Sequence, residues 1–390
     1  MALIKCEGCG SMVSDKASVC PKCGYSLVTL AKGCSKTKKN CLILLSVLAF
    51  SIISIVIWKM QDDKADMRGI GKTIEKCYYV NAFSDGLAKV QSDEIHGFIN
   101  KKGELIISEK DKWNILEGFS EGLALVVEDN KYGFINKKGE LVIPCVYNMA
   151  ENFSEGLARV RVDELEGFID KKGKQVIPCV YDRVGNFSDG MAEVMQNDMN
   201  GFINTKGEMV ISCNYDMVGN FSEGLCRVLQ DGKFGFINKK GEVVIPCTYK
   251  TSYEQAFWGS DFSEGLAVVT NGDGLYGFID KKGVLVIPCI YDMAWGFSEG
   301  LAVVAKDNKQ GFINKNGEMV ISCIYNLASS FSEGLARVNK DGKEGFINKK
   351  GELAILCKYD FTESFSEGLA VVTKGDKKGF VDLSLIHISE

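Results

Sequence analysis

The chain has 390 residues, of which 46% are hydrophobic and 25% are charged, which is ordinary for a chain that builds folded domains. Its 42 glycines and 5 prolines favour many regular turns built on glycine. The only histidines are His96 and His387, which disfavours a mechanism that needs a histidine base. The net charge of −5 combines a basic head, residues 1–40, with an acidic remainder. We therefore expect no nucleic acid partner.

Residues 1–26 are predicted to form a zinc ribbon. Two Cys-x-x-Cys pairs are separated by ten residues: Cys6, Cys9, Cys20 and Cys23. Four thiolates are the soft ligand set that holds one tetrahedral Zn²⁺, and a site closed by four cysteines is structural rather than catalytic. A redox pair or disulfides are the alternatives. The segment closely resembles the short zinc-ribbon heads of many bacterial membrane proteins.

Residues 41–58 are predicted to cross a membrane as a single helix. They contain no charged residue, and at about 1.5 Å per residue a helix of this length spans a bilayer core. The lysines of a basic linker, residues 27–40, precede the segment, and Trp58 ends it. The positive-inside rule then places the amino terminus in the cytoplasm and everything after a second linker, residues 59–73, outside it. A buried core helix is the alternative.

The remaining chain, residues 74–382, is dominated by a repeat of about 34 residues. A Phe-Ser-Glu/Asp-Gly-Leu/Met string starts each unit, and a Gly-Phe-Ile/Val-Asn/Asp string follows it. Units of this size are too small to fold alone and bury their apolar faces by stacking. The nine starting residues are Phe83, Phe119, Phe153, Phe187, Phe221, Phe262, Phe297, Phe331 and Phe365.

Each unit is predicted to form three short antiparallel strands. In the unit 153–186, Ala158 and Val160 alternate with Arg159 and Arg161, the period of a half-buried strand whose arginines face water. The position of Ala158 holds only Ala or Cys in all units, which indicates the close approach of a neighbouring strand.

The second and third predicted strands of this unit are joined by a turn. Phe168 is expected to be buried, and residues 170–173 fit a type I turn closed by a left-handed glycine. Pro178 cannot donate to a ladder, so the third strand lies at an edge or a bulge there. Alternation places three side chains of that strand on one face: Ile177, Cys179 and Tyr181.

The strings FSEGLA, GFINKKGE and VIPCxYD resemble the bacterial WG-containing β-repeat (KWG-type) family over residues 83–382. The resemblance implies a binding or structural role and no reaction. The family's tryptophan is replaced by an aromatic residue in three units and by polar or charged residues elsewhere, so we expect this position to be partly exposed. The three aromatic residues are Tyr132, Phe234 and Tyr276.

The predicted fold is an all-β tandem repeat array. We favour an open β-superhelix, because nine units exceed the usual 4–8 blades of a propeller. A closed, propeller-like ring is the alternative, and residues 74–80 resemble a degenerate third strand that could close it. Residues 383–390 depart from the repeat and are interpreted as a truncated or artefactual end.

One insertion is a candidate ligand site. Seven extra residues after Cys247 carry Tyr253, Phe257 and Trp258. Insertions in arrays fall in surface loops, and aromatic residues are enriched in binding hot spots. The alternative is a loop that covers a junction between repeats.

The lysine pairs of the turns and the repeated cysteines are both predicted to have structural roles. Lysine pairs in the turns are read as solvated residues, with a row that binds an anionic polymer as the alternative. Seven cysteines share one repeat position and are read as small buried residues rather than metal ligands. They are Cys145, Cys179, Cys213, Cys247, Cys289, Cys323 and Cys357.

Together these features predict a membrane-anchored, non-enzymatic binding or scaffold protein with a cytoplasmic zinc ribbon and an extracytoplasmic array. Its predicted partners are the membrane and an unidentified protein or envelope polymer. A structural envelope spacer without a ligand is one alternative, and an envelope hydrolase is another, although no nucleophile–base pair is visible.

Overall fold

The computed structural model divides into two compact units, Met1–Gln61 and Asp62–Glu390. In the first unit, β1 (Leu3–Lys5) pairs antiparallel with β2 (Met12–Ser14). The four predicted zinc ligands, the hydrophobic segment at 41–58 and the three aromatic residues of the insertion lie outside the described residues. The structure describes residues 3–5, 12–14, 77–108, 114–250, 261–271 and 273–385.

Within those ranges, no helix has the length and apolar character needed to cross a membrane.

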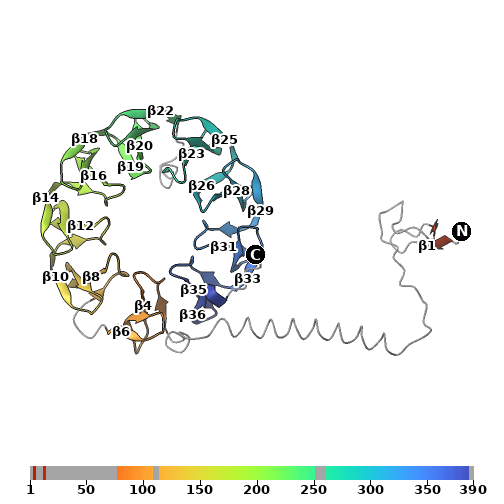
Figure 1. Cartoon of the computed structure of the whole chain (residues 1–390), viewed down its shortest axis with the longest axis horizontal. Coiled ribbons are helices and arrows are strands. Elements are labelled where there is room, and N and C mark those ends of the chain that lie inside the picture. The colour runs from red at the N-terminus through yellow and green to blue at the C-terminus, as the bar shows by residue number, and fades with distance from the viewer. Residues whose placement is uncertain are drawn as a thin grey trace. The chain divides into compact units, whose positions relative to one another are not determined.

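The second unit is a ring of antiparallel sheets, which we call blades (Figure 1). Each blade follows the chain order, and the second strands lie nearer the middle of the ring than the last strands do. Blades 1 to 3 comprise β3 (Tyr79–Val80), β4 (Leu87–Gln91), β5 (His96–Asn100) and β6 (Leu105–Ser108); β7 (Asn114–Ile115), β8 (Leu123–Glu128), β9 (Lys131–Asn136) and β10 (Leu141–Tyr147); and β11 (Met149–Ala150), β12 (Leu157–Val162), β13 (Leu165–Asp170) and β14 (Gln175–Tyr181).

Blades 4 to 6 continue the same order. They comprise β15 (Arg183–Val184), β16 (Met191–Gln196), β17 (Met199–Asn204) and β18 (Met209–Tyr215); β19 (Met217–Ser222), β20 (Leu225–Gln230), β21 (Lys233–Asn238) and β22 (Val243–Lys250); and, among described residues, β23 (Leu266–Thr270), β24 (Tyr276–Asp280) and β25 (Leu285–Tyr291).

Blades 7 to 9 complete the ring. They comprise β26 (Met293–Ser298), β27 (Leu301–Lys306), β28 (Lys309–Asn314) and β29 (Met319–Tyr325); β30 (Leu327–Ala328), β31 (Leu335–Lys340), β32 (Lys343–Asn348) and β33 (Leu353–Tyr359); and β34 (Phe361–Thr362), β35 (Leu369–Lys374) and β36 (Lys377–Asp382), followed by the 3₁₀ turn Leu383–Leu385.

The array closes, so the open superhelix favoured from the sequence is wrong and the ring is confirmed. The ring of Phe380 in blade 9 packs on that of Phe83 in blade 1, with centroids 5.0 Å apart. An equivalent phenylalanine pair fills each of the other eight interfaces between adjacent blades, which we call seams. Closure therefore repeats the packing found inside the array.

Closure uses no strand shared between the first and last blades. The segment expected to be a degenerate third strand contains β3, which pairs with β4 and is the innermost strand of blade 1. Most blades carry such a short first strand, as β11 shows in blade 3. The prediction of three strands per unit missed it, because two residues are too short to show a strand period.

Both faces of a blade are buried. Ala158 packs with Phe134 and Ile143 of the preceding blade, which confirms the close approach predicted at that position. Phe168, also confirmed as buried, packs on the following blade. The expectation that Arg159 faces water is wrong: its side chain is only 16% exposed and its Nη1 donates to Val184 O of the next blade at 2.6 Å.

The last strand of each blade bulges. In blade 3, Phe168 pairs with Ile177 and Glu166 with Tyr181, so two extra residues enter β14. The bulge turns Cys179 toward the preceding blade, whereas Ile177 and Tyr181 face the following one. The prediction that these three share a face is therefore wrong, and the bulge predicted at Pro178 is confirmed.

Glycine is required opposite this bulge. A Cβ atom on Gly167 would lie 2.6 Å from Ile177 O and 2.7 Å from Cys179 N. The turn after β13 is as predicted: Gly173 has φ 78° and its N–H donates to Asp170 O at 2.9 Å.

Candidate functional site

The Phe-Ser-Glu/Asp-Gly strings form two-residue turns. In blade 3, Ser154 and Leu157 exchange backbone hydrogen bonds, while Glu155 and Gly156 have φ values of 53° and 82°. Positive φ at both central residues defines a type I′ hairpin turn. A glutamate in this conformation costs about 1–2 kcal/mol, which indicates that the carboxylate has a compensating role.

That role is a contact between blades, which we call the clasp. The serine Oγ donates to the carbonyl of the phenylalanine that starts the next unit; Ser154 Oγ and Phe187 O, for example, are 2.9 Å apart. The contact occurs at all nine seams, including Ser366 Oγ to Phe83 O at 2.8 Å. The other donors are Ser84, Ser120, Ser188, Ser222, Ser263, Ser298 and Ser332.

The acid of each string completes the clasp. Its carboxylate accepts the glycine N–H of the next string at every seam. At seven seams a turn lysine of the next blade also pairs with it, as Lys349 does with Glu299 at 3.0 Å. Thr205 and Leu383 occupy the lysine position opposite Glu155 and Glu333. The first turn lysine is therefore solvated, as predicted, with a side chain 42–46% exposed, and at seven seams it is also ion-paired.

The pKa values of four clasp acids reflect these contacts. The hydrogen bond from Lys239 lowers the pKa of Asp189, against the effect of burial. At Glu223, Glu264 and Glu367, burial raises the pKa, but the lysine and glycine hydrogen bonds outweigh it and the net pKa is lowered.

The residue before the Gly-Phe pair, where the family has tryptophan, is not partly exposed as expected in several blades. Glu166, Asn200, Phe234 and Glu344 are buried. Glu166 accepts from Val184 N at 2.9 Å, and the other two polar residues likewise bond to backbone at the start of the next blade. In these four blades the next blade covers the position. In the other five the residue is partly exposed, as expected: His96, Tyr132, Tyr276, Gln310 and Lys378.

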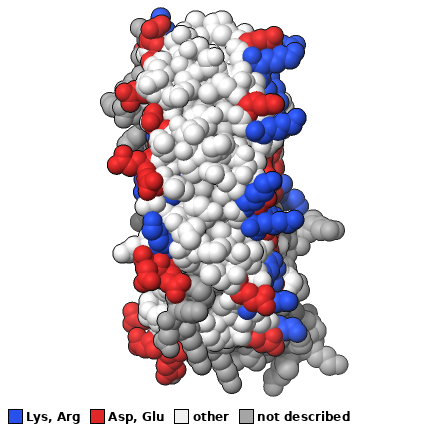
Figure 2. Space-filling model, turned by 90° about the vertical axis from the view of Figure 1, so that its left-hand side faces the viewer, with Lys and Arg blue, Asp and Glu red and all other residues white. Residues whose placement is uncertain are grey.

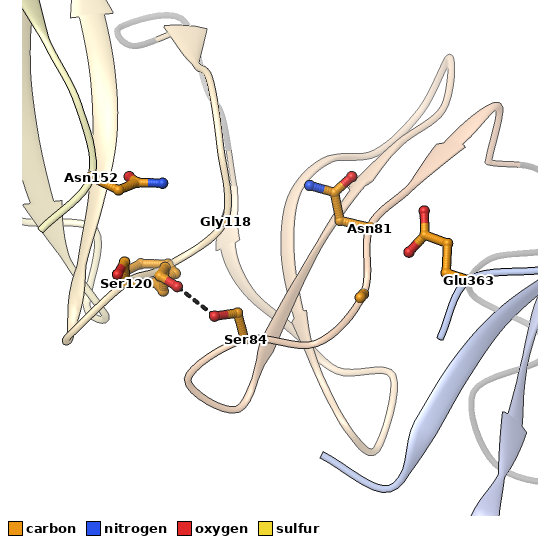
Figure 3. Close-up of a pocket in the computed structure, with 8 residues that line it drawn as sticks. Asn81, Ser84, Gly118, Ser120, Asn152 and Glu363 are labelled. Carbon is orange, nitrogen blue, oxygen red and sulfur yellow. Dashed lines mark hydrogen bonds between the residues drawn. The ribbon is translucent and has the colours of Figure 1, made fainter. Parts of the chain in front are cut away.

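A polar pocket of about 520 Å³ lies at the inner ends of blades 9, 1, 2 and 3 (Figure 3). Its labelled lining residues precede or belong to the clasp strings, so the innermost strands and I′ turns position them. Asn81 and Asn152 point toward one another, and the Glu363 carboxylate lies on the Asn81 side. The clasp residues of the lining are Ser84 and Ser120.

The amides of Asn81 and Asn152 offer both donors and acceptors to the pocket, whereas three other side chains, Ser84, Ser120 and Glu363, offer acceptors. The hydroxyl protons of Ser84 and Ser120 are already donated to Phe119 O and Phe153 O, so these oxygens offer only lone pairs to a ligand. Burial raises the pKa of Glu363, opposed by a hydrogen bond with the Ala82 backbone and by nearby Lys378 and Arg337. An acceptor-rich lining with one carboxylate suits a ligand that donates hydrogen bonds.

Sequence reasoning did not find this pocket, since its residues are not adjacent in the chain. The sequence-predicted zinc site and aromatic site lie outside the described residues, so both stay predictions. Among described residues, no group of three His, Cys, Asp or Glu side chains is arranged to hold a metal ion. The seven repeated cysteines are half-buried free thiols, and burial raises their pKa values.

The sequence matches the WG containing repeat family eight times between residues 97 and 377, over most of the chain. The chain belongs to this family. The eight matches are at residues 97–132, 132–165, 167–199, 201–234, 234–274, 276–309, 311–343 and 345–377. Each match begins near a Gly-Phe pair, so the eight WG repeats run from one blade into the next and together span nine blades.

No curated protein sequence matches the chain. Among solved structures, it is similar to one described as the eukaryotic initiation factor, at 12% identity and a TM-score of 0.47, covering 81% of this chain and 92% of that one. Hsv2p of Kluyveromyces lactis matches at 13% identity and a TM-score of 0.36, covering 60% and 92%.

Proposed function

We propose that this WG-repeat ring is a non-enzymatic binding protein whose inner pocket takes a ligand rich in hydrogen-bond donors, such as an amine or guanidinium group. The observation that carries the proposal is the acceptor-rich lining, in which both serine protons are already used and Glu363 supplies a carboxylate. No histidine or second titratable side chain lines the pocket with Glu363, which favours binding over general acid–base catalysis.

The proposal keeps the membrane anchor and the zinc ribbon predicted from the sequence. Residues 41–58 would tether the ring outside the cytoplasm, and Cys6, Cys9, Cys20 and Cys23 would hold structural zinc inside it. The uncharged stretch and the preceding lysines support this topology. Cysteine labelling of intact cells tests it: a tag after residue 70 should react and a tag at residue 2 should not.

Calorimetric titration tests the pocket. The ring fragment, residues 62–390, should bind diamines or guanidinium compounds more tightly than neutral sugars, and Glu363→Gln should remove that preference. Asp307→Asn, an exposed acid in blade 7 that does not line the pocket, is the control. Equal binding by Glu363→Gln and the unmodified ring would refute the proposal.

The binding should also strengthen as pH rises. Glu363 attracts a cation only when ionised, and its raised pKa moves this transition above the usual range of a glutamate.

The second candidate function is a spacer without a ligand. The clasp favours the spacer function, because the repeated serine and acid side chains are engaged in contacts between blades at every seam. Absence of binding to every cationic and neutral probe, in a ring that is folded, would support the spacer.

A further inference from the structure

An uncharged band follows the outer edge of blades 2, 3 and 4 (Figure 2). Seven large apolar side chains on the last strands of these blades are between 37% and 57% exposed. We call them the outer arc: Leu141, Val142 and Val146 of β10, Val176 and Val180 of β14, and Met209 and Val210 of β18. Contiguous exposed apolar surface of this kind commonly marks an interaction site.

The strand edges of the outer arc are poorly suited to strand addition. β10, β14 and β18 are the last strands of their sheets, so one edge of each is unpaired. Each is bulged, and Pro144 and Pro178 remove backbone donors from two of them. Bulges and prolines protect edges from pairing with another strand, so a partner must contact the side chains.

The two margins of the outer arc carry opposite charge. The last strand begins after the Lys-Lys-Gly turn and ends at the opposite side of the ring, next to the turn between the second and third strands. The exposed lysines Lys138, Lys172, Lys174 and Lys206 follow the first margin, beside Glu140 and Glu208. The exposed acids Asp129, Asp163, Glu164, Asp182, Asp198 and Asp216 follow the second, beside Lys131 and Arg183.

Figure 2 shows this arrangement: blue and red atoms border one side of the white band, and mostly red atoms border the other.

A two-fold axis that runs along the band, between two facing rings, would exchange the margins. The lysine margin of one ring would then face the acidic margin of the other while the apolar residues meet in the centre. An isologous interface must be self-complementary in this way.

We propose that the outer arc is the interface of a two-fold symmetric dimer formed with a second copy of this chain. The rim of blades 7 and 8 lacks the same polarity: lysines stand beside the acids on the second margin, as Lys306 does beside Asp307 and Lys343 beside Asp341. Equivalent apolar side chains, such as Ile324, are exposed there too, so these blades provide a control.

Sedimentation equilibrium tests the proposal on the ring fragment, residues 62–390. This fragment contains all nine clasps and every core cluster of the ring, so it is self-contained. The unmodified ring should show a mass that rises from monomer to dimer with concentration. Val180→Asp should weaken the dimer at least about a hundredfold, because it buries an unpaired charge. Ile324→Asp, at the same strand position of blade 7, should leave it unchanged.

A charge exchange tests the symmetry independently. Variant A carries Lys138→Glu, Lys172→Glu and Lys206→Glu, and variant B carries Asp163→Lys, Asp182→Lys and Asp198→Lys. Each alone should be monomeric, because like-charged margins meet in either homodimer. An equimolar mixture should form a heterodimer.

Three outcomes would overturn the proposal. A monomeric unmodified ring at all concentrations would do so, as would equal effects of Val180→Asp and Ile324→Asp. A monomer that instead floats with phosphatidylglycerol vesicles would assign the outer arc to a lipid surface.

Discussion

Closure of the ring depends on one seam that no chain connection supports. At the seam between blades 9 and 1, Glu367 accepts Gly86 N at 3.0 Å and pairs with Lys101 Nζ at 3.1 Å. We expect Glu367→Gln to increase transient opening of this seam. The substitution keeps an oxygen that can accept from Gly86 but removes the charge.

The magnitude follows from the interactions that the substitution weakens. A hydrogen bond to a charged group contributes about 1.5–3 kcal/mol and a neutral one about 1 kcal/mol, while an exposed ion pair adds about 0–1 kcal/mol. Because the Glu367 side chain is 30% exposed and Lys101 is 44% exposed, we take a value near the low end, about 1 kcal/mol. The population of the open ring should therefore rise about fivefold.

Glu299→Gln is the matched control. Glu299 accepts Gly334 N at 3.1 Å and pairs with Lys349 at 3.0 Å, with 30% and 46% exposure. Blades 7 and 8 are joined by the chain, so this seam cannot separate freely. Both variants should lower the melting temperature similarly.

Hydrogen exchange followed by mass spectrometry should separate the two variants. Only Glu367→Gln should speed exchange in β4, β35 and β36. Equal exchange in the two variants would refute closure through this clasp and would favour an array that is open in solution.

Other predictions follow from the same structural features. Gly167→Ala should destabilise the ring by about 3 kcal/mol, measured by urea unfolding, because the added Cβ would collide with Ile177 O. Gly190→Ala is the control: it has open space around it, so it should lower the free energy of unfolding less, and only through its φ of 78°. Four clasp acids, Asp189, Glu223, Glu264 and Glu367, have lowered pKa values, so their contribution to stability is complete above the ordinary carboxyl pKa of about 4 and is lost as pH falls through the lowered values. The unfolding midpoint should drop below about pH 4, and a midpoint constant to pH 2 would contradict this. Residues 1–30 should bind one zinc ion and lose structure with a chelator; metal content near zero in freshly reduced protein would exclude the zinc ribbon.

Local features of the ring could be predicted from the sequence alone. The burial of Phe168, the type I turn at residues 170–173 and the bulge at Pro178 each depend on a few neighbouring residues. The turn needs a side-chain acceptor and a glycine, and the bulge needs a residue that does not donate. Such requirements act within one unit, so the repeat displays them directly.

The inner pocket could not be predicted in the same way. Glu363 and Asn81 come from opposite ends of the array and meet only because blade 9 packs on blade 1. Sequence distance hides this contact: the clasp that joins these blades links residues 281 positions apart. The repeated serine and acid were visible in the sequence, but their partners on the next blade were not.

The tertiary structure decided whether the array closes into a ring and which side of each strand is exposed to solvent. The period of the sequence sets the size of a blade, while the angle between neighbouring blades sets whether nine of them close, and that angle arises from the packing of entire faces. Arg159 shows the same limit, because a strand with alternating polar residues has a solvent side only if no neighbour covers it. In this ring the next blade does cover it, and the arginine is accommodated because the Val184 carbonyl accepts its hydrogen bond.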